Sequence, residues 1–140
     1  MANLVYNSFK QKIMDGSIDL DTDTIRVALV TSTYTPNIDT HEDYADITNE
    51  VVGTAYVAEG AALASKAVTK DTTNDRGMFD AADVTWAAST ITARAAIVYK
   101  DSGTAATSWF ICYVDFGSDK VSTAGDFKIT WDTAGILYIG

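Results

Sequence analysis

The chain has 140 residues, of which 47% are hydrophobic and 21% are charged. These proportions are ordinary for a globular fold and argue against disorder, so we expect a single domain over residues 1–140. Nineteen acidic and ten basic residues give a net charge of −9. This acidic balance disfavours nucleic acid and anionic membranes as partners.

The N-terminal segment is predicted to be helical. Val5, Phe9 and Ile13 recur every fourth residue, which places them on one face of a helix over about residues 3–15. Asn3 is the expected N-cap, and Asp15-Gly16 supplies the stop signal. Because the hydrophobic period then changes from four to two, residues from about 20 to 140 are predicted to form a β domain.

Short alternating segments predict the strands. Residues 24–30 show the pattern well, because Ile25, Val27 and Leu29 share one face that we expect to be the only buried one. The other expected strands are 51–57, 64–70, 78–79, 84–86, 91–99, 109–116, 127–131 and 136–139. Residues 101–103 should join two of these strands into a hairpin. The fold class is therefore mostly β, a jelly-roll-like β-sandwich of about eight short strands with one N-terminal α-helix.

Residues 33–50 contain the only proline and many residues that favour turns. We expect a long polar loop with a short helical turn around residues 42–45. Loops of this length are uncommon in compact domains and are often functional. The alternative is an α+β domain in which this segment forms a second helix.

The side chains that could support catalysis are few. His41, the single histidine, lies in an acidic stretch, and we expect it to be a solvated loop residue. The sequence has no Gly-x-Ser-x-Gly motif that would supply a serine nucleophile for this histidine. Cys112 lies in the apolar run 109–114 and is expected to pack in the core. Because it is the only cysteine, the chain cannot form an internal disulfide, which is consistent with a reducing compartment. No residue is assigned as catalytic, and we expect no enzymatic activity.

One acidic string resembles part of a metal site. Asp19, Asp21 and Asp23 match the first three ligand positions of a helix–loop–helix calcium loop. That loop then needs a glycine and a bidentate glutamate where this chain has Thr24 and Val30, so we assign no metal and no cofactor. The motif at residues 115–117 spells Asp-Phe-Gly but is interpreted as a strand end, and Trp86, Trp109 and Trp131 are interpreted as core residues rather than a sugar platform.

Four segments resemble a widespread family of small virion proteins of tailed bacteriophages. They are residues 3–10 (NLVYNSFK), 16–30 (GSIDLDTDTIRVALV), 83–94 (DVTWAASTITAR) and 125–137 (GDFKITWDTAGIL). The similarity is greatest to the cement, or decoration, proteins of phage heads, and it covers nearly the whole chain. It implies a jelly-roll-like β fold but no individual functional residue.

The resemblance also implies a function and a place of action. The expected role is a capsid cement protein that binds the outer surface of the head and clamps neighbouring subunits of the major capsid protein. It would be made in the host bacterial cytoplasm, since the start lacks a signal-peptide pattern and no segment is long and apolar enough to span a membrane. A homodimer is favoured and a trimer is possible, because capsid sites lie on symmetry axes.

Two points remain open at this level. Helix 3–15 and loop 33–50 are the candidate contact elements, chosen by elimination. The alternative function is a tail- or head-fibre module that binds a receptor or glycan through exposed aromatic side chains.

Overall fold

The computed structural model describes residues 1–140 and is mostly β, with 47% of residues in strands and 10% in helices. The single α-helix is α1 (Asn7–Met14), and two 3₁₀ turns lie at Tyr44–Asp46 and Ala105–Thr107. The strands are β1 (Leu4–Val5), β2 (Ile25–Val30), β3 (Ala61–Ala62), β4 (Ala67–Asp71), β5 (Arg76–Asp80), β6 (Val84–Lys100), β7 (Phe110–Ile129) and β8 (Leu137–Ile139).

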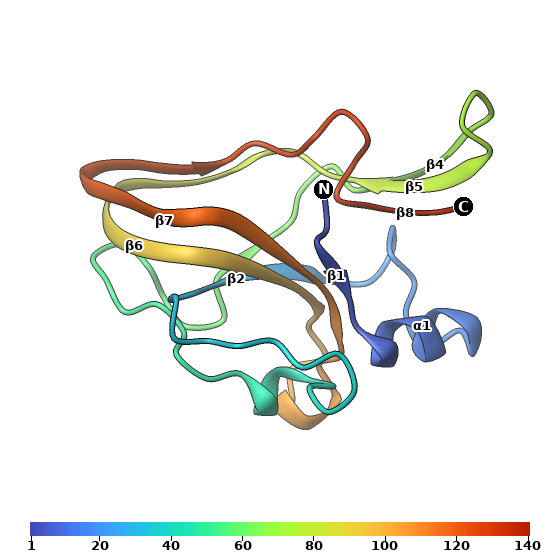
Figure 1. Cartoon of the computed structure of the whole chain (residues 1–140), viewed down its shortest axis with the longest axis horizontal. Helices are drawn as coiled ribbons and strands as arrows, with labels where there is room; N and C mark the ends of the chain where they lie inside the picture. The colour runs from blue at the N-terminus through green and yellow to red at the C-terminus, as the bar shows by residue number, and fades with distance from the viewer.

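The strands form two antiparallel sheets. The larger sheet has the order β1-β7-β6-β2-β3, and the smaller has the order β4-β5-β8. Figure 1 shows the β6–β7 hairpin spanning the length of the larger sheet, with the β4–β5 turn projecting beyond it and α1 below the smaller sheet. The two sheets meet near the N-terminus, where the Ala2 N–H donates to the Ile136 carbonyl oxygen at 2.9 Å.

Two strands are much longer than expected. The predicted strands 84–86 and 91–99 are parts of β6, and most of 109–116 and of 127–131 belongs to β7. These strands stay paired along their length because irregularities absorb the polar residues between the alternating segments. The largest is in β7, where Ala93 pairs with Lys120 but Ala95 pairs with Asp115. The hairpin between β6 and β7 is confirmed.

The residues that bulge out of β7 explain the Asp-Phe-Gly motif. Gly117 has a φ of +81°, a conformation that glycine adopts without steric cost. The Asp115 carboxylate accepts from the Gly117 N–H (2.8 Å) and pairs with Arg94 through two hydrogen bonds of 2.7 and 3.3 Å. This pairing holds the pKa of Asp115 below its usual value. The motif therefore lies at a bulge inside β7, and its interpretation as a strand end was wrong.

α1 is shorter than the predicted helix 3–15. Leu4 and Val5 pair with β7 instead, so the helix begins at Asn7. Asn3 is not the N-cap: its side-chain oxygen accepts from the Asp115 N–H at 2.6 Å and fastens the N-terminal segment to β7. The prediction was wrong because hydrogen bonding to a neighbouring strand outweighed local helix signals, which contribute little by themselves.

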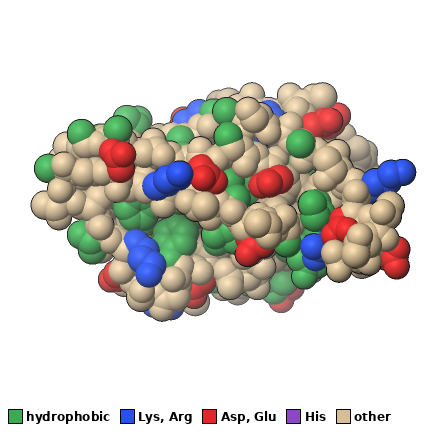
Figure 2. Space-filling model, turned by 90° about the horizontal axis from the view of Figure 1, so that it is seen from above, with side chains coloured by type: hydrophobic (Ala, Val, Ile, Leu, Met, Phe, Trp, Pro, Cys, Tyr) green, Lys and Arg blue, Asp and Glu red, His purple; other side chains and the backbone are tan.

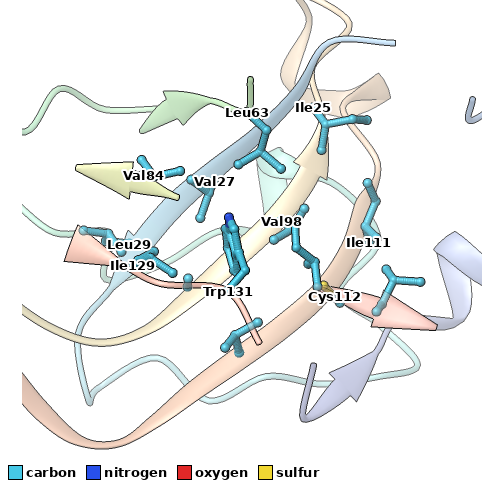
Figure 3. Packing of buried hydrophobic residues seen from close by; sticks show 14 of the residues in the cluster. Ile25, Val27, Leu29, Leu63, Val84, Val98, Ile111, Cys112, Ile129 and Trp131 are labelled. Atoms are coloured by element: carbon cyan, nitrogen blue, oxygen red, sulfur yellow. The ribbon is translucent and has the colours of Figure 1, made fainter. Parts of the chain in front are cut away.

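The main hydrophobic core lies between the two sheets. Figure 3 shows side chains of β2, β6 and β7 around Trp131, among them Ile25, Val27, Leu29 and Val98. Each fully buried aliphatic side chain contributes roughly 1.5–3 kcal/mol relative to an exposed one. The alternation predicted for β2 therefore points its apolar face into this core.

A second cluster covers the opposite face of the larger sheet, so β2 is buried on both faces rather than on one. Ala28 and Val30 are fully buried there beside Tyr6 and Tyr34. Tyr34 comes from the loop 33–50, which packs on the sheet and contains a 3₁₀ turn rather than a second helix. The loop therefore acts as a cover for this face.

The predicted strand 51–57 does not form. Its polypeptide turns sharply at Ala55, which has a φ of +64°, and Gly53 pairs with Tyr56 through an isolated bridge. Val51 and Tyr56 are buried while Val52 is exposed, so the hydrophobic residues of this segment do not share one face. The high content of valine was a misleading strand signal. The Val51 N–H donates to the Leu29 carbonyl oxygen (2.9 Å) and Thr54 forms an isolated bridge with Thr90, but these contacts do not continue into a strand.

Candidate binding surface

His41 is a hydrogen-bonded anchor and not the solvated residue that we expected. Its Nδ1 atom lies 2.8 Å from the Tyr34 hydroxyl, which lies 2.9 Å from the Tyr6 hydroxyl. The Asn37 N–H also donates to Nδ1 at 3.3 Å. Burial raises the pKa of Tyr34 to about 12, so its hydroxyl stays protonated. The imidazole therefore fastens the loop to the second cluster, with no serine, threonine or cysteine nucleophile bonded to it.

Cys112 lies in the main core, as predicted. The side chain is fully buried in β7, and burial raises the pKa of its thiol to about 12. A reactive cysteine needs an accessible thiolate, which this environment disfavours. Cys112 is therefore a packing residue.

The acidic string is tied to two lysines. The Asp23 carboxylate accepts from the Asp19 N–H (2.8 Å) and lies 2.9 Å from Lys100 Nζ. Lys66 Nζ donates to the Asp23 carbonyl oxygen at 2.5 Å. No three acidic, histidine or cysteine side chains of the chain converge on a common point that could hold a metal ion. Asp23 thus connects the α1–β2 segment to β6.

The three tryptophans do not form a joint platform. Trp86 and Trp131 belong to the main core, as predicted, and the Trp131 Nε1–H donates to the Ala82 carbonyl oxygen at 3.1 Å. Trp109 is only partly buried, and Lys12 Nζ lies 4.4 Å from the centre of its ring. A sugar-binding stack of these residues is therefore absent from the surface.

The loop 33–50 is fixed at its C-terminal end by a carboxylate. Glu50 accepts hydrogen bonds from the Tyr44 hydroxyl, the Tyr56 hydroxyl (2.7 Å) and the Glu59 N–H (2.8 Å). Burial, together with the nearby Glu50 charge, raises the pKa of both tyrosines, which keeps them protonated as donors. This predicted contact element is thus bound tightly to its own domain.

An extended surface with many apolar side chains lies where the sheets meet α1. Three adjoining hollows of about 390, 310 and 430 Å³ follow one another from the β7 bulge, past the N-terminal segment, to α1 and β8. The first two share Met1, and the second and third share Val5, Leu137 and Tyr138. We call this surface the apolar track.

Several apolar side chains of the track are strongly exposed. Met14 is 83% exposed, Val121 65% and Ile139 57%. Figure 2 shows apolar side chains gathered in a hollow of the surface seen from above, with both basic and acidic side chains around it. A row of exposed apolar side chains in adjoining hollows is typical of a surface that binds another molecule.

The predicted contact elements contribute unequally to this track. Phe9, Ile13 and Met14 of α1 line its third hollow, whereas the loop 33–50 lines none of the three. Sequence reasoning missed Val121 and Ile139. Ile139 stands in a segment that looks like an ordinary strand, and Val121 stands between two predicted strands in a polar segment that shows no strand pattern. No local signal shows that either side chain is uncovered.

Comparisons with known proteins identified no relative of this chain. No protein-family model, no curated protein and no solved structure matches this chain. Neither α1 nor the 3₁₀ turns have the length and apolar character that a bilayer crossing requires.

Proposed function

We propose that the protein is a capsid cement protein of a tailed phage, which binds the outer surface of the head and clamps neighbouring subunits of the major capsid protein. The apolar track is the observation that carries the proposal, because it exposes Met14, Val121 and Ile139 on a β scaffold held by extensive pairing. The sequence resemblance to phage virion proteins supplies the partner. The proposal includes no enzymatic activity and no cofactor.

The geometry supports a clamp in two ways. A clamp needs a scaffold that does not deform, and the two sheets share a core of 24 buried residues. It also needs several contacts that act together, since linked weak sites gain strength through effective concentration. A homodimer on a capsid two-fold axis, or a trimer on a three-fold axis, would multiply the track contacts.

The jelly-roll-like arrangement is part of the proposal. The five- and three-stranded sheets have together the eight strands of a double-sheet jelly roll, although they divide them unequally. The fibre-module alternative would need exposed aromatic side chains, and Trp86 and Trp131 are buried. Tyr138, which is 51% exposed in the apolar track, is the one strongly exposed aromatic side chain, so no group of rings is available to stack on a sugar.

The copy number of the protein in purified virions tests the proposal. A cement protein should be present at a copy number comparable to that of the major capsid protein, measured by gel densitometry. The double variant Met14→Glu with Ile139→Glu should lower this occupancy, while Val52→Glu, at a position 97% exposed outside the track, should leave it unchanged. Absence from the head, or a copy number many-fold lower, would contradict the proposal and favour a fibre component.

A further inference from the structure

The apolar track follows the edge of a sheet rather than one of its faces. β8 is the terminal strand of its sheet, so its outer side has no strand partner. Residues 137–140 all line the third hollow, although successive side chains of a strand point to opposite faces. A hollow lined by consecutive residues therefore runs along the backbone edge of β8.

β1 approaches the track from the other side. It is the terminal strand of the larger sheet, and Val5 lines the second hollow together with Leu137. The N-terminal segment touches the β8 side where Ala2 bonds to Ile136, ahead of the strand itself. Beyond that bond the edge of β8 offers backbone N–H and C=O groups to another chain, and an open edge of this kind is a template for strand addition.

The charges beside the track have the opposite sign to the net charge of the chain. Lys10, Lys120 and Lys128 line the hollows against one acidic residue, Asp126, whereas the whole chain has ten basic and nineteen acidic residues. Lys128 lies 3.2 Å from the Asp83 carboxylate. Lys10 and Lys120 donate only to the neutral side chains of Asn7 (3.0 Å) and Ser118 (3.2 Å). The third and first hollows, at opposite ends of the track, therefore each have a lysine without a carboxylate partner.

We infer that the apolar track binds an extended segment of a partner protein, which adds a strand to the free edge of β8 and carries apolar side chains flanked by carboxylates. The apolar side chains fill the hollows, the main chain pairs with β8, and the carboxylates face Lys10 and Lys120. This inference deepens the proposed function and rests on it for the source of the segment, a neighbouring capsid subunit.

A second copy of this chain fits the track less well. In a two-fold contact the apolar track of one copy faces the apolar track of the other, so Lys10 and Lys120 of one copy would approach the same lysines of the other. Like charges brought together in a contact oppose it. A carboxylate-bearing segment removes this conflict.

Binding of synthetic peptides to the isolated full-length chain tests the inference. The probe is a short blocked peptide of alternating valine and threonine with a pair of glutamates at each end, titrated by fluorescence anisotropy. We expect saturable binding. A peptide with lysines in place of the glutamates should bind about tenfold more weakly or worse, because it opposes Lys10 and Lys120. A peptide with proline at its centre should also bind about tenfold more weakly, because proline lacks the N–H that a strand pair needs.

Variants of the chain locate the site. Met14→Glu and Ile139→Glu should each weaken binding of the glutamate peptide about tenfold, since they place a charge in the third hollow. Val52→Glu should bind like the unmodified chain, because Val52 is exposed outside the track. Retained secondary structure, measured by circular dichroism, excludes unfolding as the cause.

Three results would overturn the inference: no saturable binding, equal binding of all three peptides, or equal weakening by Val52→Glu. Self-association that Ile139→Glu abolishes, without peptide binding, would identify a second copy as the occupant and also overturn it. The virion copy number does not enter this experiment. A chain that decorates heads but ignores the peptides refutes only the inference, while one that binds them but is absent from virions refutes the proposed function.

Discussion

At the scale of single residues, the Glu50 carboxylate is the centre of a hydrogen-bond network. Its carboxylate accepts from two tyrosine hydroxyls, Tyr44 and Tyr56, and from the Glu59 N–H. Tyr56 in turn accepts from the Leu29 N–H at 2.9 Å, so the network reaches β2 in the main sheet. One side chain therefore joins three parts of the polypeptide.

Replacement of Glu50 should destabilise the fold. Glu50→Ala removes the acceptor of three donors, and an unsatisfied partly buried donor costs about 1–3 kcal/mol. We expect the free energy of unfolding to fall by about 2–4 kcal/mol in urea titrations. Glu42→Ala is the matched control, because Glu42 is an exposed residue of the same loop, and it should change stability by less than about 0.5 kcal/mol. Equal effects of the two variants would refute the network.

At the scale of elements, the close passage of one segment over a strand depends on a glycine. Gly60 has a φ of +70°, and a Cβ atom there would lie 1.8 Å from the Val27 carbonyl oxygen of β2. Gly103, in the β6–β7 connection, has a φ of +83° with no atom within 4 Å of the same position. The two glycines share the backbone conformation and differ in the space around them.

Alanine at these two positions separates the cost of a left-handed backbone from the cost of a steric clash. Gly103→Ala should cost about 1–2 kcal/mol, the penalty for a left-handed backbone with a Cβ atom. Gly60→Ala should cost more than about 4 kcal/mol or prevent folding, because a backbone oxygen blocks the methyl group. Thermal unfolding followed by circular dichroism measures both. Similar stabilities of the two variants would contradict the close contact with β2.

At the scale of the whole molecule, buried tyrosines make the stability of the fold depend on pH in the alkaline range. Burial is the main cause that raises the pKa of six of the seven tyrosines: Tyr6, Tyr34, Tyr44, Tyr56, Tyr99 and Tyr113. It also raises the pKa of the Cys112 thiol from 9.0 to about 12. These groups ionise less readily in the folded chain than in the unfolded chain.

Stability should therefore fall at high pH. Below about pH 9 both states hold these protons, so the contribution is fully present. Above about pH 9 for Cys112 and about pH 10 for the tyrosines, the unfolded state releases protons that the folded state retains, and the free energy of unfolding decreases. Urea midpoints across this range, compared with absorbance of tyrosinate, measure the effect. An unchanged midpoint up to about pH 11 would contradict the burial of these side chains.

The amino-acid pattern by itself determined the β class, the N-terminal helix and the core position of Cys112. These features depend on local periodicity and on the free energy of burying apolar side chains, both of which are readable from neighbouring residues. The face of β2 that contains Ile25, Val27 and Leu29 was predictable for the same reason.

Only the tertiary structure decided the features that involve distant segments. Leu4 and Val5 became a strand because β7 offered a partner. His41 became an anchor because it bonds to Tyr34, which in turn bonds to Tyr6. The apolar track depends on which edges have no neighbour, since Ile139 is exposed at the uncovered edge of β8. Edges and covers arise from the packing of whole elements, and a local sequence pattern carries no signal for them.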